Sequence, residues 1–167
     1  MEIRRQKDTS ALMAQIVSVE YVPWEYSAGT KDSNLKLGET RALRLGVSFD
    51  RTKAKVGEVV HCTVKAERIG FQGYGMMLAE IGLPPGVDVD RASLDVAMED
   101  HALEVGHYDI LPDRIVFYVW PKAGGSEFNF TFRPRFRMEA GTAPSLLYDY
   151  YNPEARSVVK PVKFVIN

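Results

Sequence analysis

The chain has 167 residues, of which 46% are hydrophobic and 26% are charged, and its formal net charge is −1. This length fits one domain, or one domain with an attached fragment, and this composition excludes a chain that is disordered throughout. A net charge so close to zero produces no global field that would attract nucleic acid or an anionic membrane, so neither is expected as a partner. Runs without a charged residue, such as Ile69 to Ala79, are far too short to cross a bilayer, so no membrane insertion is expected.

The residue types that usually carry catalysis or bind metals are sparse. The single cysteine, Cys62, excludes an intrachain disulfide and a cysteine-based metal site. The histidines, His61, His101 and His107, lack the short fixed spacings of metal ligands and are expected at the surface. No Gly-x-Ser-x-Gly motif is present. We therefore expect no enzyme, no catalytic residues, no metal and no cofactor.

The first forty residues differ in composition from the rest. Residues 1–10 are polar and are predicted to be a disordered tail, without the apolar run of a signal peptide. Ile16 to Val22 is typical of a strand, and Ser27 to Glu39 has the composition of a linker. We expect residues 11–38 to be the last strand of a preceding domain plus a linker, and residues 39–167 to form one domain.

Apolar and polar residues alternate with a period of two over most of that domain, which is typical of half-buried strands. The segment 76–83 is apolar on both faces, which indicates a central strand. The polar segment 50–58 is predicted to be a turn. Strands are predicted at 42–49, 60–67, 76–83, 104–111, 115–120, 128–139, 145–151 and 158–166.

One segment follows a helical period instead. Leu94, Ala97 and Met98 fall at i, i+3 and i+4, and Asp90 precedes them as an N-cap residue. A helix this short depends on packing against a sheet. The fold class predicted from the whole pattern is all-β: an antiparallel β-sandwich with one short α-helix at about residues 90–100.

Three arginines mark the polar face of the segment 128–139. Arg133, Arg135 and Arg137 share one parity, while the apolar parity includes Phe136, and Pro134 indicates an edge strand or a bulge. Charges on an edge strand prevent pairing with other sheets. The same row of charges also suits docking of an acidic partner. Both interpretations are kept.

Several segments occur in an order known from one family. Met76 to Leu83 is followed by Pro-Pro-Gly and the short helix, Ile115 to Val119 precedes the aromatic strand, and Tyr148 to Pro153 precedes the last strand. From Ala42 to the C-terminus the chain resembles the receptor-binding domain of the alpha-macroglobulin family. The sequence of Gly73 to Ser93 is similar to that of the bacterial members of this family.

This resemblance implies a β-sandwich with one exposed helix, acting as a non-catalytic C-terminal module of a protease inhibitor. The expected partners are other domains of a larger chain, with target proteases reached only through that parent protein. The expected location is extracellular, periplasmic or at the cell envelope. The thioester motif Cys-Gly-Glu-Gln of many relatives is absent, because Thr63, Val64 and Lys65 follow Cys62.

The resemblance also implies a candidate partner-binding pair. Animal relatives offer two helix lysines, four residues apart, to a receptor, and the corresponding positions here are Arg91 and Asp95. Arg91 keeps the positive charge of the first lysine, and Asp95 reverses the charge of the second. Arginine is also not equivalent to lysine as a hydrogen-bond donor. A second hypothesis is a cell-surface module that binds protein or glycan through the arginines at 133, 135 and 137 or through aromatic residues. These aromatic residues are Trp24, Trp120 and the segment from Tyr148 to Tyr151.

Overall fold

The computed structural model describes residues 42–71 and 75–167. The predicted tail, strand and linker at 1–38, including Trp24, lie outside the described residues. The elements are β1 (Leu43–Phe49), β2 (Lys53–Ala54), β3 (Val60–Arg68), η1 (Ile69–Phe71), β4 (Met77–Gly82), β5 (Val87–Val89), α2 (Arg91–Asp100), β6 (Val105–Ile110), β7 (Arg114–Val119), β8 (Ser126–Pro134), β9 (Met138–Gly141), β10 (Ser145–Asp149), β11 (Arg156–Val159) and β12 (Lys163–Ile166).

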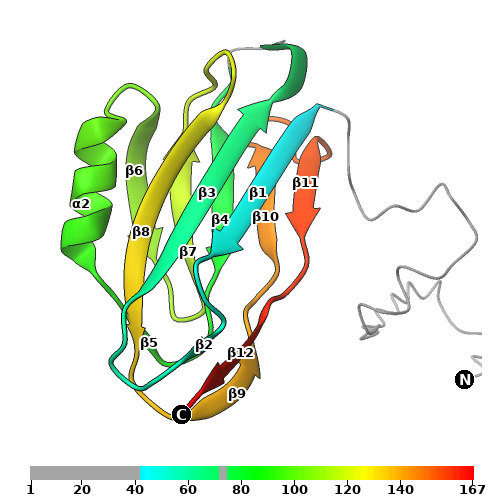
Figure 1. Cartoon of the computed structure of the whole chain (residues 1–167). Helices are drawn as coiled ribbons and strands as arrows, with labels where there is room; N and C mark the ends of the chain where they lie inside the picture. The colour runs from blue at the N-terminus through cyan, green and yellow to red at the C-terminus, as the bar shows by residue number, and fades with distance from the viewer. Residues whose placement is uncertain (1–41, 72–74) are drawn as a thin grey trace, which may run out of the picture.

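Two sheets lie face to face (Figure 1). One has the strand order β1-β3-β8-β5 and the other the order β11-β10-β4-β7-β6. All pairings within these two sheets are antiparallel. A small sheet, β2-β12-β9, closes one end of the molecule and includes a parallel pairing of β2 with β12. The all-β sandwich predicted from the alternation is confirmed.

The core between the sheets is rich in phenylalanine. The ring of Phe117 on β7 lies 4.7 Å from that of Phe128 and 5.8 Å from that of Phe130 on β8, measured between centroids. All three are almost completely buried. Burial of one such side chain contributes roughly 1.5–3 kcal/mol, so this cluster holds the two sheets together. The central position predicted for Met76 to Leu83 is also confirmed, because β4 lies between β10 and β7.

The helix covers the side of the sandwich beside β8 and β6 (Figure 1). Leu94 and Ala97 are buried, and Met98 packs against the core. The side chain of Asp90 accepts a hydrogen bond of 3.1 Å from the backbone N–H of Ala92, as an N-cap residue does. The predicted helix and its N-cap are therefore confirmed. No helix among the described residues is long and apolar enough to span a membrane.

Three local predictions were wrong. The segment 158–166 is not one strand: β11 ends at Val159, and β12 begins at Lys163 in a different sheet, because Pro161 cannot donate to a ladder. The segment 50–58 is not only a turn, since it contains β2.

The third error concerns 128–139. Strand β8 ends at Pro134, and β9 starts at Met138 in the small sheet. Phe136, expected on the buried parity, is 63% exposed. Nor is β8 an edge strand, since it lies between β3 and β5. Pro134 is tolerated because it is the last residue of the strand, where its missing N–H breaks no ladder.

The sandwich has two ends that contain different elements, the entry end and the distal end. The entry end is where β1 begins at Leu43, opposite Arg68, and where β10 ends at Asp149, opposite Met77. The distal end holds the small sheet and the last residues of β8 (Figure 1).

Candidate functional site

The exposed face of α2 carries the predicted pair Arg91 and Asp95. Both are exposed and lie one turn apart on the helix. The hydroxyl of Tyr108 on β6 donates a 2.9 Å hydrogen bond to Asp95. Burial, together with this carboxylate, raises the pKa of Tyr108. The structure thus brings Arg91 and Asp95 to one surface and occupies part of the Asp95 carboxylate with a neighbouring strand.

An open depression lies between α2 and β6 beside this pair. Its lining combines charged, aromatic and thioether side chains, which suits contact with a protein surface better than enclosure of a small molecule. The lining residues are Arg91, Asp95, Met98, Glu99, His107 and Tyr108.

Helix α2 is held against β8 by polar contacts as well as by its apolar face. The hydroxyl of Ser93 donates to the backbone carbonyl of Asp90 over 2.7 Å and accepts from the N–H of Thr131 over 2.9 Å. The hydroxyl of Thr131 also lies 3.3 Å from the Asp90 carboxylate. These bonds fix the start of α2 to a core strand, so Arg91 projects from a rigid position.

The arginines predicted as a row on one strand do not lie on one strand. Arg133 belongs to β8, whereas Arg135 and Arg137 lie in the connection between β8 and β9. All three are exposed. The three arginines therefore all lie at the distal end. The exposed Phe136 lies between Arg135 and Arg137 in the sequence.

The segment from Tyr148 to Pro153 is largely structural. Asp149 is buried and accepts a 2.5 Å hydrogen bond from the guanidinium of Arg68, with which it forms an ion pair. Its other oxygen accepts from the N–H groups of Tyr151 and Asn152, at 2.8 and 2.9 Å. Burial opposes ionisation of Asp149, but these donors outweigh it and lower its pKa. This carboxylate ties the end of β10 to the end of β3.

The ion pair of Arg68 with Asp149 was not predicted, although the sequence contained a signal for it. Arg68 continues the parity of Val60, Cys62 and Val64, which is the buried face of its strand. A charged residue on a buried parity needs a partner of opposite charge. Asp149 lies 81 residues away, so the sequence alone did not identify it.

Tyr148 takes part in a separate polar network on the outer face of the five-stranded sheet. Its hydroxyl donates to Glu80 over 3.0 Å, and Arg114 pairs with the same carboxylate at 2.6 Å. Burial, and then the Glu80 carboxylate, raise the pKa of Tyr148 to about 12. By contrast, Tyr150 and Tyr151 are 50% and 76% exposed. In the segment from Tyr148 to Pro153, Tyr148 is therefore half-buried and Asp149 is buried, whereas Tyr150 and Tyr151 are exposed.

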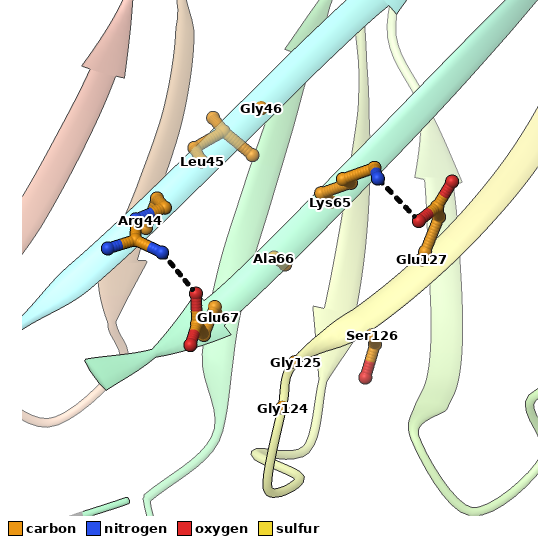
Figure 2. A pocket seen from close by; sticks show the side chains of 10 residues that line it. All are labelled: Arg44, Leu45, Gly46, Lys65, Ala66, Glu67, Gly124, Gly125, Ser126 and Glu127. Carbon is orange, nitrogen blue, oxygen red and sulfur yellow. Dashed lines mark hydrogen bonds and ion pairs between the residues drawn. The ribbon is translucent and has the colours of Figure 1, made fainter. Parts of the chain in front are cut away.

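A hollow on the four-stranded sheet is lined by residues of β1, β3 and β8 and by Gly124 and Gly125 (Figure 2). Two ion pairs border it, Arg44 with Glu67 at 3.0 Å and Lys65 with Glu127 at 2.7 Å. Figure 2 shows each pair bridging neighbouring strands. Since each cation already faces a carboxylate, the hollow presents little unbalanced charge to a ligand.

The residue types associated with catalysis are dispersed. His61 and His107 are exposed on different sheets, and His101 follows α2. Cys62 is buried, and its burial raises the pKa of the thiol, which makes it a poor nucleophile. No group of three or more metal-ligating side chains occurs in the described ranges.

The fold and these surfaces define a β-sandwich domain with one exposed helix. Residues 72–160 match the family described as the A-macroglobulin receptor binding domain. Since this match covers more than half of the sequence, the chain belongs to that family. No curated protein sequence matches the chain.

Solved structures of bacterial alpha-2-macroglobulins share the fold. The C-terminal part of native Escherichia coli alpha-2-macroglobulin superposes with a TM-score of 0.64 at 12% identity, covering 75% of this chain and 23% of that chain. The native conformation of the E. coli protein, from cryo-electron microscopy, gives 0.63 at 11% identity, covering 75% and 9%. Salmonella alpha-2-macroglobulin reacted with methylamine gives 0.61 at 12% identity, again covering 75% and 9%. The chain thus spans less than a quarter of each relative.

Proposed function

We propose that this chain is the non-catalytic C-terminal module of an alpha-macroglobulin-like protease inhibitor, contributing interdomain packing and protein interaction. The observation that carries the proposal is the family match over residues 72–160. The small share of the solved bacterial relatives that the chain spans supports a larger parent protein. The parent would act outside the cell, in the periplasm or at the envelope, where it meets foreign proteases.

We also propose the domain boundaries that the sequence composition predicts. Residues 39–167 form the sandwich, and residues 11–38 supply the last strand of a preceding domain and the linker. In support, the ladder of β1 begins at Leu43, immediately after the proposed linker. The chain then enters the sandwich at one end, as a domain joined by a linker does.

A non-catalytic role agrees with the chemistry of the described residues. His61 and His107 are exposed, while Cys62 is held in its thiol form by burial. Acyl transfer needs a nucleophile beside an oriented base, and no such set is formed in the described ranges. Protease inhibition would therefore belong to the parent protein.

Within this role we assign Arg91 and Asp95 to partner contact. They project from a helix whose start is fixed to β8, beside the open depression facing β6. The partner would be a neighbouring domain or a protein that recognises the exposed helix. The hydrogen bond from Tyr108 orients Asp95, so less side-chain entropy is lost on contact.

Two measurements test the proposed function. The full chain should not slow the cleavage of a protein substrate by elastase or trypsin, and clear inhibition would overturn the non-catalytic, parent-dependent role. The reading frame upstream of Met1 should continue into a long multidomain protein. A stop codon directly upstream, in frame, would contradict the proposal.

A second candidate function is a cell-surface module that binds protein or glycan. The observation that favours it is the exposure of Trp120, Tyr150 and Tyr151. Val119 and Asp149 both pair with Met77 at the entry end. Trp120 and Tyr150 follow these two residues, so the exposed aromatic side chains lie at that same end. Binding of a glycan panel that is lost in W120A would support this function over the first.

A further inference from the structure

The distal end carries a surface that neither the fold nor the proposed function explains. We call it the distal basic surface and define it as Arg133, Arg135, Phe136 and Arg137 with the flanking glycines Gly57 and Gly86. It lies at the end of the sandwich opposite the start of β1 (Figure 1).

Backbone hydrogen bonds on both flanks fix this surface. The N–H of Gly57 donates to the carbonyl of Pro134 over 2.8 Å, and the N–H of Arg135 donates to Gly86 over 3.1 Å. The guanidinium of Arg133 donates to the carbonyl of Gly57 over 3.2 Å. The end of β8 and the start of its connection to β9 are thus fixed to the neighbouring turns.

The phenyl ring of Phe136 is positioned rather than loose. A Cβ atom at Gly86 would lie 3.0 Å from this ring, so the ring rests over the turn that contains Gly86. Gly86 has φ of 69°, a conformation that other residues rarely adopt. Despite this support, Phe136 remains 63% exposed, so its ring is available for contact with a partner.

The charges of this surface are unbalanced. Among residues 42–71 and 75–167, Arg135 and Arg137 form no ion pair and no side-chain hydrogen bond. Elsewhere the exposed cations Arg44 and Lys163 face the carboxylates of Glu67 and Glu139, whereas Lys53 and Lys160 form no ion pair among the described residues. Asp88 lies opposite Arg133 in the ladder of β5 and β8 without forming an ion pair.

From these observations we propose that the distal basic surface docks an acidic polypeptide segment. An apolar side chain of the segment would pack on Phe136, while carboxylates on either side would bind the guanidinium groups of Arg135 and Arg137. Arginine binds carboxylate in a two-pronged geometry, and arginine and aromatic residues are the types that most often dominate interface energies. Because the backbone is already ordered, little conformational entropy is lost on binding.

This assignment adds a surface to the proposed function and does not depend on it. Arg91 follows β5, which pairs with the last residues of β8, so the two surfaces adjoin there. They consist of different side chains, so each can be tested by its own substitutions.

The test uses a synthetic acidic peptide, acetyl-Glu-Glu-Leu-Glu-Glu-amide, titrated into the full isotope-labelled chain at low salt. We expect backbone amide shifts confined to residues 133, 135–137 and 86, with weak affinity that falls as salt rises. Arg135→Glu with Arg137→Glu should weaken binding by about tenfold or more, because attraction becomes repulsion. Phe136→Ser should weaken it by roughly threefold or more, because the apolar contact is lost.

A matched control reverses the same number of charges elsewhere. Arg44→Glu with Lys65→Glu changes the net charge equally, but on the outer sheet face, and should leave binding within about twofold. A peptide with glycine in place of leucine should bind more weakly than the parent peptide. Circular dichroism checks that each variant is folded.

Several outcomes would overturn the proposal. Binding that is unchanged in the Arg135 and Arg137 variant would show that these arginines do not contact the peptide. Binding that is lost equally in the control would show that only net charge matters. Concentration-dependent dimerisation in light scattering that the Phe136 variant abolishes would assign the surface to a second copy of the chain. Binding to phosphatidylserine vesicles without binding to the peptide would assign it to a lipid surface.

Discussion

Arginine has different roles at the two ends of this sandwich. At the entry end Arg68 is buried, and its guanidinium pairs with Asp149 at 2.5 Å. At the distal end Arg135 and Arg137 are exposed, and no carboxylate pairs with them in the described part of the chain. The residue type is the same, so the difference arises from burial and from the presence of a partner.

The comparison separates a structural charge from a charge available for recognition. A buried cation that loses its partner carries an uncompensated desolvation cost, whereas an exposed cation is solvated by water with or without a partner. We therefore expect substitutions at the entry end to change stability and substitutions at the distal end to change binding. Substitutions at the two ends test this difference between stability and binding, and the largest effect is expected at the entry end.

Asp149→Ala should produce the largest loss of stability. It leaves the buried Arg68 without its counter-charge and removes the acceptor of the Tyr151 and Asn152 N–H groups. Breaking one partner of a buried ion pair costs about 3–5 kcal/mol. Urea unfolding followed by circular dichroism measures this change, and a loss below about 1 kcal/mol would contradict a structural role for the pair.

The pH dependence of stability should reflect the same carboxylate. The pKa of Asp149 is lowered in the folded state, so its contribution is present above the unfolded pKa of about 3.9 and is lost as pH falls through the lower folded value. Wild type should therefore lose more stability than Asp149→Asn between about pH 5 and pH 2. Parallel curves for the two proteins would show that Asp149 is not responsible.

Tyr148→Phe tests a half-buried interaction between these extremes. The substitution removes the 3.0 Å hydrogen bond to Glu80 while keeping the ring. The free energy of unfolding should fall by about 0.5–1.5 kcal/mol. In wild type, ultraviolet titration should also reveal one tyrosine that ionises near pH 12, and its absence in the variant would assign it to Tyr148.

Arg135→Ala with Arg137→Ala should produce the smallest change in stability. Because both side chains are exposed and unpaired among the described residues, the free energy of unfolding should stay within about 0.5 kcal/mol. The same variant should lose binding of the acidic peptide. A stability loss comparable to that of Asp149→Ala would remove the distinction between the two ends.

Local pattern predicted much of the fold. Alternation of apolar residues located β1, β3, β6, β7 and β10, and a run that is apolar on both faces located β4. The spacing of Leu94 and Ala97 after Asp90 located α2. The errors cluster where parity continued through a proline. Phe136 keeps the parity of Phe132, yet the chain leaves the sheet between them at Pro134. Parity describes a strand only as long as the strand continues.

The sequence was enough to name the residues of the candidate surfaces, but not to predict how these residues lie together. Arg91, Asp95 and the arginines at 133, 135 and 137 could all be named from the sequence. The contact of Tyr108 with Asp95, and the support of Phe136 by Gly86, join residues that are not neighbours in any local pattern.

The amino-acid sequence by itself determined the all-β class, helix α2 and its N-cap, because these depend on periods and on residues a few positions apart. Tertiary structure alone decided that β8 lies between β3 and β5, that Arg68 pairs with Asp149, and that Phe136 faces solvent. Strand order and ion pairing arise from contacts between distant segments, whose free energies no local window contains.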